Sequence, residues 1–213
     1  MFTGIIQAQG NIKEIRASSK GVVFVLNSNS LDLSNVSIGD SIAVNGVCLT
    51  VTQLDKNYFS SDVSQETLDC TTFSQLKKGQ NINLEKSLRL NQGVDGHIVS
   101  GHVDGVGKIT FIAIEGDSTR MKIKVDDNLV KYIAKKGSIC INGVSLTVNE
   151  IDGNVFDVNI VPHTFSVTTL DELKVNSQVN IEIDIIARHI ERLLNHKTGA
   201  RINKALLIKD GYL

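Results

Sequence analysis

The feature that most constrains the fold of this chain is an internal duplication. Residues 41–54 (SIAVNGVCLTVTQL) and residues 138–151 (SICINGVSLTVNEI) align without a gap, and eight of the fourteen positions are identical. Average residue usage would give roughly one identity by chance. Because each copy carries the same pattern of apolar and polar positions, we expect two like units in tandem.

The match continues at the same offset of 97 residues through the rest of each copy. Further identical pairs are Phe59 and Phe156, Thr67 and Thr164, Asn83 and Asn180, and Glu85 and Glu182. The join lies in residues 86–96, a stretch with turn residues and little periodicity. We therefore expect an N-terminal domain over residues 1–96, a second domain over 97–186, and a C-terminal helix and tail over 187–213.

Within a copy, short runs of alternating apolar and polar residues are separated by turn residues, which is typical of a small antiparallel barrel or sandwich. The expected strands of the first copy cover residues 2–7, 22–26, 41–44, 47–54, 58–63 and 80–84. Six strands favour closure into a barrel. Asn45-Gly46 and Asn142-Gly143 each lie between alternating apolar residues, which predicts a two-residue hairpin turn at both places.

A helix is expected after the second copy. Ile186, Ile190, Leu193 and Leu194 recur there at helical spacing and form one apolar face. Nothing in the first copy repeats this pattern. We expect the face to pack against another subunit or across the barrels, and simple capping of its own barrel is the alternative.

The composition of the chain argues against nucleic acid and an anionic membrane as partners. The 22 Lys and Arg residues balance 23 Asp and Glu residues, so no bulk charge attracts nucleic acid or an anionic membrane. Three tyrosines, seven phenylalanines and no tryptophan are too few for a base-stacking platform. No apolar run approaches the roughly 18 residues of a membrane-spanning helix, and the N-terminus lacks the features of a secretory signal.

The number and spacing of the cysteines indicate a reducing cellular compartment. Cys48, Cys70 and Cys140 are an odd number at irregular spacing, which fits reduced thiols better than a disulfide framework. They also lack the short spacing of a zinc-binding pair. We expect a cytoplasmic protein without a structural metal.

Strand alternation gives the first indication of a site. Val47, Leu49 and Val51 fall on one face of their strand, so Cys48 and Thr50 must point away from the barrel interior. The same reasoning turns Ser145 and Thr147 outward in the second copy. A small polar face of this kind is often merely solvated, but its repetition in both copies favours a pair of pockets.

A second candidate is the segment GHIVSGHVDG at residues 96–105, which contains two histidines and three glycines. Glycines allow a ligand or another backbone to come close. His97 and His102 are five residues apart, a poor spacing for binding one metal ion. Structural hydrogen bonding is the plain alternative for either histidine, and no phosphate-binding loop, dinucleotide fingerprint or nucleophile elbow is present.

Two like pockets suit a reaction between two like molecules, or else a pair of equivalent binding sites. Holding both reactants in place converts a bimolecular step into an effectively unimolecular one.

Four segments together carry a resemblance to a known family. MFTGII at residues 1–6, NGVCLTV at 45–51, SGHVDG at 100–105 and NGVSLTV at 142–148 resemble the alpha-chain riboflavin synthase family of lumazine-binding tandem-barrel proteins. The resemblance covers nearly the whole chain. It implies an all-β fold of two tandem six-stranded antiparallel Greek-key β-barrels plus a C-terminal α-helix that assembles a homotrimer.

The resemblance also implies a transferase activity, the last step of riboflavin biosynthesis. Two molecules of 6,7-dimethyl-8-ribityllumazine would dismutate to riboflavin and 5-amino-6-ribitylaminouracil, with no cofactor and no metal. The working site would lie between the N-terminal barrel of one subunit and the C-terminal barrel of a neighbour. Association with lumazine synthase is also compatible with the resemblance.

Site residues carry over motif by motif. The implied first pocket is shaped by Phe2 and Ser41 and lined by Gly4, Ile5, Ile6, Cys48, Leu49, Thr50, Asp62, Val63, Ser64, Gln65, Glu66 and Thr67. The implied second pocket is lined by Gly101, His102, Val103, Lys136, Ser145, Leu146, Thr147, Asn159, Ile160, Val161, Pro162, His163 and Thr164. The residues implied for catalysis are Cys48, His102, Ser145 and Asp184.

In this chemistry one lumazine loses a proton from its C7 methyl group, and the other accepts a nucleophile at C7. We expect Cys48 to assist the addition, and His102, Ser145 and Thr147 to serve the other pocket. The sequence leaves open which pocket holds the donor. It also leaves open that Cys48 is only a pocket wall, His102 a structural residue and Lys136 a solvated turn residue.

Two functions are alternatives to the enzymatic activity that the resemblance implies. A non-catalytic lumazine or flavin carrier of the same fold is the closer one, but such carriers tend to lose the second-copy motifs that this chain keeps. A small-barrel nucleic-acid module would need a basic stripe with interleaved aromatic residues, and neither copy has one.

Overall fold

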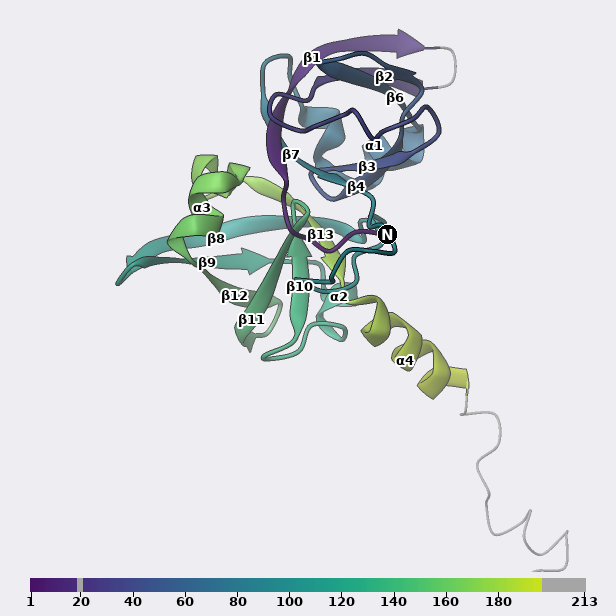
Figure 1. The fold of residues 1–213 in the computed structure, drawn as a ribbon. Helices are drawn as coiled ribbons and strands as arrows, with labels where there is room; N and C mark the ends of the chain where they lie inside the picture. The colour runs from purple at the N-terminus through teal and green to yellow at the C-terminus, as the bar shows by residue number, and fades with distance from the viewer. Residues whose placement is uncertain (19–20, 197–213) are drawn as a thin grey trace, which may run out of the picture.

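The computed structural model describes residues 1–18 and 21–196. Two β-rich units lie one against the other, and helix α4 (Ile185–His196) extends from the second unit (Figure 1). No helix within the described residues is long and apolar enough to cross a membrane. The expected C-terminal tail, residues 197–213, lies outside them.

Within the described residues the first copy folds into a seven-stranded sheet of order β4-β3-β7-β1-β2-β6-β5, with antiparallel neighbours throughout. Its elements are β1 (Ala8–Ser18), β2 (Gly21–Asn27), β3 (Ser41–Val44), β4 (Val47–Thr50), β5 (Gln53–Leu54), β6 (Tyr58–Val63), helix α1 (Gln65–Cys70), the one-turn helix η1 (Thr72–Gln75) and β7 (Asn81–Lys86).

The second copy closes into a barrel of order β10-β11-β12-β9-β8-β13. Its elements are β8 (Gly105–Glu115), β9 (Ser118–Lys124), helix α2 (Asp127–Val130), β10 (Ser138–Ile141), β11 (Val144–Asp152), β12 (Val155–Ile160), helix α3 (Pro162–Val167), the one-turn helix η2 (Thr169–Glu172) and β13 (Gln178–Ile183). The two copies share one strand order, and the predicted all-β fold of two tandem repeats with a C-terminal helix is confirmed. Among the described residues the expected six-stranded closure is found in the second copy, whereas the first copy forms an open sheet.

The first copy differs at one strand. The expected strand over residues 47–54 divides into β4 and β5, which form the two ends of the sheet. The division follows a change of partner: Val51 N donates to the carbonyl of Asp40, whereas Thr52 N donates to the carbonyl of Ser60 in β6, both at 2.8 Å. The equivalent strand β11 is continuous and closes the second barrel.

The expected strand over residues 2–7 is wrong, because the first strand of the first copy begins at Ala8. Phe2 leaves its own copy and pairs with Val99, the equivalent residue at the start of the second copy. Phe2 N donates to the Val99 carbonyl at 2.7 Å, and Val99 N donates to the Phe2 carbonyl at 3.1 Å. The apolar alternation of this segment thus serves a contact between the copies.

Each copy has its own apolar core. Phe24 and Phe73 lie with ring centroids 5.3 Å apart in the first, and Ile123 and Phe156 are fully buried in the second. The predicted Asn-Gly hairpin turns are confirmed at both positions, with Asn and Gly in the left-handed region. Repeated sequence therefore gives repeated local structure.

Buried asparagines fasten the copies together. Asn83 Nδ2 donates to the carbonyl of Asn142, and Asn180 Nδ2 donates to the carbonyl of Asn45, both at 2.9 Å. The two bonds are equivalent in the repeat, because Asn180 lies 97 residues after Asn83 and Asn142 lies 97 residues after Asn45. The contact therefore has an approximate two-fold axis, like the interface of a homodimer.

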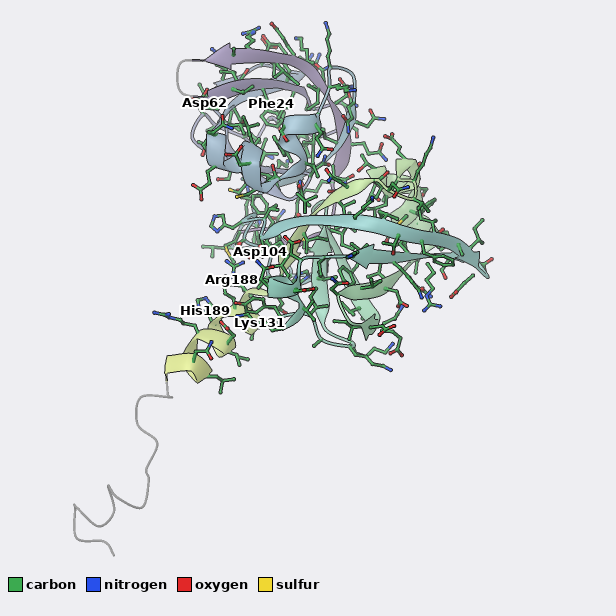
Figure 2. All side chains as sticks on the ribbon, turned by 180° about the vertical axis from the view of Figure 1, so that it is seen from behind. Phe24, Asp62, Asp104, Lys131, Arg188 and His189 are labelled. Carbon is green, nitrogen blue, oxygen red and sulfur yellow. The ribbon has the colours of Figure 1, made fainter. Side chains whose placement is uncertain are left out.

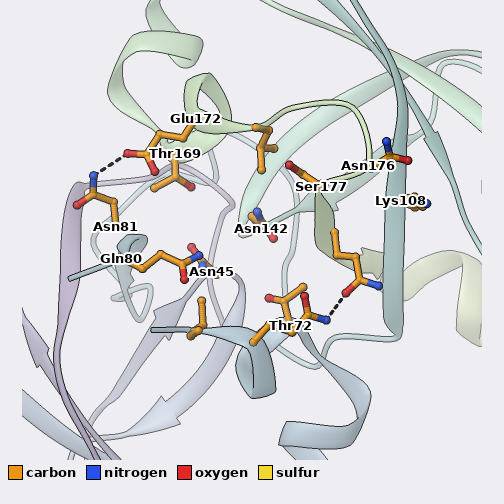
Figure 3. A pocket seen from close by; sticks show the side chains of 14 residues that line it. Asn45, Thr72, Gln80, Asn81, Lys108, Asn142, Thr169, Glu172, Asn176 and Ser177 are labelled. Carbon is orange, nitrogen blue, oxygen red and sulfur yellow. Dashed lines mark hydrogen bonds between the residues drawn. The ribbon is translucent and has the colours of Figure 1, made fainter. Parts of the chain in front are cut away.

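A polar cavity of about 660 Å³ lies across this axis (Figure 3). It is bridged by Asn81 Nδ2, which donates to Glu172 Oε1 at 2.6 Å, and by the bond from Gln75 to Gln178. These two bonds are again related by the 97-residue offset. None of the predicted site residues lines this cavity, which belongs to the contact between the copies.

Helix α4 is held to the second barrel by its polar side. Arg188 forms an ion pair with Asp104, and Glu191 bonds Lys131 and the hydroxyl of Tyr132. Figure 2 shows Arg188 and Asp104 together at the base of the helix. The predicted apolar face, Ile186, Ile190, Leu193 and Leu194, is at least half exposed at every residue. Capping of its own barrel is therefore not the function of this face.

Candidate active site

The first candidate site is a pocket of about 280 Å³ beside the outward face of β4. We call it the Cys48 pocket, and it is lined by Val47, Cys48, Glu66, Thr67, Cys70, Thr71, Gly101, His102 and Val103. Strand alternation places it: Val47 and Leu49 are buried in the core, while Cys48 is half-buried and Thr50 is exposed. The predicted outward direction of Cys48 and Thr50 is confirmed.

The second candidate site is a pocket of about 350 Å³ beside the equivalent face of β11. We call it the Ser145 pocket, and it is lined by Ile5, Asp95, Gly96, Ser138, Ser145, Leu146, Thr147, Asn149, Asn159, Val161 and Thr164. Its hydroxyl and amide groups suit a ligand with several hydrogen-bonding atoms, and the two pockets share no lining residue.

The copies exchange their leading segments, so the expected grouping of residues is corrected. Ile5, expected beside Cys48, lines the Ser145 pocket, and His102, expected beside Ser145, lines the Cys48 pocket. Backbone bonds enforce the exchange: Ser145 N donates to the Gly4 carbonyl at 2.8 Å, and Cys48 N donates to the Gly101 carbonyl at 2.9 Å. Each pocket is therefore built from both copies.

Glycine permits the close approach that this exchange requires. A β-carbon on Gly4 would stand 2.6 Å from the β-carbon of Ser145, and one on Gly101 would stand 2.5 Å from that of Cys48. Both glycines also have positive φ angles, +75° and +81°. Any side chain at either position would displace the pocket wall.

A buried glutamate holds each exchanged segment. Glu85 Oε1 accepts bonds from the amide and the hydroxyl of Thr3, both at 2.7 Å, and Glu85 Oε2 accepts from Gly4 N at 3.1 Å. Glu182 accepts the equivalent bonds from Ser100 and Gly101 at 2.6–3.0 Å. Burial raises the pKa of Glu85, and the bonds from Thr3 and Gly4 oppose that shift.

Known proteins share both the repeat and its length. A model of the lumazine binding domain matches residues 3–87 and again residues 100–184. Riboflavin synthase of Photobacterium phosphoreum is 45% identical over 217 residues, which cover 100% of both chains. Riboflavin synthase of Bacillus subtilis (strain 168) is 39% identical over 216 residues, again covering 100% of both.

The chain belongs to the riboflavin synthase family. A similar solved structure is that of LumP complexed with 6,7-dimethyl-8-(1'-D-ribityl) lumazine. It is 29% identical, has a TM-score of 0.76, and the match covers 86% of this chain and 99% of that chain.

Several residues that the family resemblance implied for the site face the cores instead. Leu49, Val63 and Ile160 are almost fully buried in the apolar clusters. Phe2 is also buried, and a β-carbon on Gly101 would lie 2.9 Å from its ring. Phe2 thus supports the wall of the Cys48 pocket from behind.

Other predicted residues lie outside both linings. Ser64 Oγ accepts a bond from Thr67 N at 3.2 Å and so caps the short helix α1. Ser41 pairs with Thr50 across β3 and β4, and its equivalent Ser138 lines the Ser145 pocket. The remaining ones, namely Ile6, Thr50, Asp62, Gln65, Pro162 and His163, are absent from both linings.

Two charged candidates lie outside the linings. Lys136 has a φ of +64°, and its Nζ donates to Asn149 Oδ1 at 3.3 Å, next to the Ser145 pocket. Asp184 precedes α4, where its Oδ1 accepts from Ile186 N at 2.9 Å. The bond to Ile186 gives Asp184 a helix-capping role within one chain.

One histidine that the family resemblance did not assign touches the site. His97 Nδ1 lies 2.7 Å from Ser145 Oγ. His97 belongs to the glycine-rich candidate segment of residues 96–105, but nothing in its spacing indicates Ser145 as the partner. The two glutamates had a clearer signal, because Glu85 and Glu182 are identical acids at equivalent positions of the repeat.

Proposed function

We propose that this chain catalyses the dismutation of two 6,7-dimethyl-8-ribityllumazine molecules to riboflavin and 5-amino-6-ribitylaminouracil. The observation that carries the proposal is the 45% identity to riboflavin synthase of Photobacterium phosphoreum over all of both chains. The paired pockets support it, since two like molecules need two like sites.

The reaction requires different catalytic assistance at the two pockets. One lumazine loses a C7 methyl proton and becomes a carbanion that the pteridine ring delocalises, and the other accepts a nucleophile at C7. A four-carbon unit then passes between them, and no oxidant or reductant enters the balance. Orientation of the two molecules can supply roughly 7–11 kcal/mol of the barrier.

We assign the addition to the Cys48 pocket and the proton loss to the Ser145 pocket. Cys48 lies half-buried at the first, and His102, from the other copy, also lines it. Ser145 and Thr147 present hydroxyl groups at the second. His102 therefore assists the addition pocket, since the exchange of segments removes it from the side of Ser145.

The working site is shared between subunits in this proposal. The reacting lumazines must touch, yet the two pockets of one chain have no lining residue in common. A second copy therefore supplies the facing pocket. The apolar face of α4, exposed and directed away from its own barrel, supplies a contact for assembly, and we propose a homotrimer.

The same proposal places the reaction in the cytoplasm, because Cys48, Cys70 and Cys140 are free thiols that suit a reducing compartment. Association with lumazine synthase stays a prediction from the resemblance.

The test is to mix the purified chain with 6,7-dimethyl-8-ribityllumazine alone. We expect riboflavin fluorescence to rise without any added cofactor, with one uracil product formed for each riboflavin. Tight binding of the lumazine with no riboflavin formed would overturn the proposal and favour the carrier.

A further inference from the structure

The cavity between the copies has buried polar side chains that the contact itself does not fully use. Asn45, Thr72, Asn142 and Thr169 line it and are all more than nine-tenths buried, and we call these four residues the floor of the cavity. Figure 3 shows their side chains around it. The two asparagines are equivalent in the repeat, and so are the two threonines. Both copies therefore present the same pair of polar groups.

The asparagine from the first copy has one polar group left without a partner. Asn45 N donates to the Asn83 carbonyl at 2.9 Å, and the Asn45 carbonyl accepts from Asn180 Nδ2 at 2.9 Å. Asn45 Oδ1 accepts from Asn83 N at 2.8 Å. Because a backbone N–H can only donate, this bond fixes the orientation of the amide and leaves Nδ2. No residue of the described chain bonds Asn45 Nδ2.

The asparagine from the second copy repeats this arrangement. Asn142 N donates to the Asn180 carbonyl at 3.0 Å, and the Asn142 carbonyl accepts from Asn83 Nδ2 at 2.9 Å. Asn142 Oδ1 accepts from Asn180 N at 2.8 Å, and its Nδ2 has no bond to any described residue. Two amide groups, each with two protons to donate, thus remain for a molecule in the cavity.

The threonines add two hydroxyl groups. Thr72 N donates to Asn180 Oδ1, and Thr169 N donates to Asn83 Oδ1, both at 2.8 Å. Neither hydroxyl is bonded to a residue within the described ranges. Polar groups of buried side chains nearly always have hydrogen-bond partners. Four such groups on one cavity therefore call for a polar molecule that bonds them.

The rest of the lining indicates the class of molecule. Lys108 and Glu172 are the charged residues of the lining, one of each sign, and both are exposed. They give the cavity no net charge, which disfavours an ion. Leu76 and Leu173, again an equivalent pair, contribute apolar side chains. Amide donors, hydroxyl groups and apolar side chains together match an alcohol, because each C–OH both accepts and donates and its carbon chain is apolar.

We propose that this cavity binds a neutral acyclic polyol. Hydroxyl oxygens of the polyol accept from Asn45 Nδ2 and Asn142 Nδ2, and further hydroxyl groups bond Thr72 Oγ1 and Thr169 Oγ1. The approximate two-fold axis favours a chain with like groups at both ends. The volume of about 660 Å³ is in the range of small-molecule sites. Because the cavity shares no lining residue with either pocket of the candidate active site, the proposal does not rest on the proposed function.

The test is a titration of the ¹⁵N-labelled full chain with ribitol, a neutral polyol with a hydroxyl group on each carbon. We expect saturable shifts of the side-chain amide resonances of Asn45 and Asn142. Pentane-1,5-diol has the same carbon chain without the inner hydroxyl groups, and it should shift neither resonance. Inorganic phosphate is the probe for an anion site and should also shift neither.

The double variant Thr72→Val/Thr169→Val removes both hydroxyl groups and keeps the shape of the side chains. We expect its affinity for ribitol to fall at least about fivefold, because two hydrogen bonds are lost. Its unfolding midpoint should stay near that of wild type, since neither hydroxyl bonds the described chain. Thr110→Val, on β8 and outside the cavity, is the matched control and should bind ribitol like wild type.

The outcomes that reject the polyol site are distinct. No saturable shift with ribitol, or equal shifts with pentane-1,5-diol, would overturn the proposal. Shifts with phosphate in place of ribitol would also overturn it and indicate an anion site at Lys108. If the double variant does not fold, the two single variants are measured, and the two-fold arrangement predicts equal losses of affinity. Wild-type affinity in the double variant, or in both single variants, would exclude the threonines from binding and reject the site.

Discussion

Gly46 and Gly143 meet back to back where the two copies touch. A β-carbon on Gly46 would stand 2.7 Å from the amide nitrogen of Gly143, and one on Gly143 would stand 2.8 Å from that of Gly46. Both glycines are the second residues of the Asn-Gly hairpins, with φ angles of +80° and +83°. The hairpin turns of the repeat therefore also form the centre of its symmetric interface.

We predict that Gly46→Ala destabilises the chain beyond the usual cost of a left-handed alanine. That cost is about 1–2 kcal/mol, and the clash with Gly143 adds about 1–3 kcal/mol of overpacking. The free energy of unfolding is measured by urea titration.

The matched control is Gly79→Ala, because Gly79 has a φ of +84° but nothing within 4 Å of its β-carbon. The free energy of unfolding of Gly79→Ala should fall only by the cost of a left-handed alanine. Equal losses in the two variants would show that the Gly46–Gly143 contact does not constrain the interface.

Much of this arrangement can be predicted from the sequence. The duplication predicts equivalent pockets, the Asn-Gly pairs predict the turns, and alternation predicts the outward direction of Cys48. The exchange of segments cannot be predicted in this way, because a repeat shows which positions are equivalent and not which copy they contact. Ile5 beside Cys48 and Ile5 beside Ser145 satisfy the same pattern.

The contact of His97 was unpredictable for a related reason. It depends on the path of the chain from residue 86 to His97, and the spacing of this segment does not indicate which residue of the other elements it contacts. The apolar face of α4 was predicted from spacing, but its orientation was not. That orientation follows from the ion pairs of Arg188 and Glu191 with the second barrel.

We predict that Glu85→Gln changes the pH dependence of stability. The pKa of Glu85 is raised in the folded chain by burial, so the folded state holds its proton above the unfolded pKa of about 4.5. Between these two values the folded chain binds more protons than the unfolded chain, and stability falls as pH rises. Glu85→Gln removes this fall.

The measurement is the free energy of unfolding at several pH values between 4 and 8. Relative to Glu85→Gln, wild type should become progressively less stable across the window. Asp171→Asn, at an exposed residue of the one-turn helix η2, is the control and should run parallel to wild type. A constant difference between wild type and Glu85→Gln would contradict the raised pKa.

We predict that Ile190→Lys lowers the mass of the assembled protein. Ile190 lies on the exposed apolar face of α4, and a charge there would be buried against a second copy at a cost of several kcal/mol. Arg192→Gln, on the opposite side of the helix by its spacing, should leave the mass unchanged. Analytical ultracentrifugation makes the comparison, and an unchanged mass for Ile190→Lys would exclude this face from assembly.

We predict that Gly101→Ala, but not Gly4→Ala, changes the accessibility of the Cys48 thiol. The exchange of segments places Gly101 against Cys48, where a β-carbon would overlap that of Cys48 at 2.5 Å, and places Gly4 against Ser145. The rate of Cys48 alkylation in a Cys70→Ser background is followed by mass spectrometry, with buried Cys140 as the internal reference. Because both variants put alanine at a positive φ, the backbone strain is matched and the difference reports the contact. A shift of at least about threefold in Gly101→Ala alone is expected. The same shift in Gly4→Ala alone would mean that each leading segment lines the pocket of its own copy.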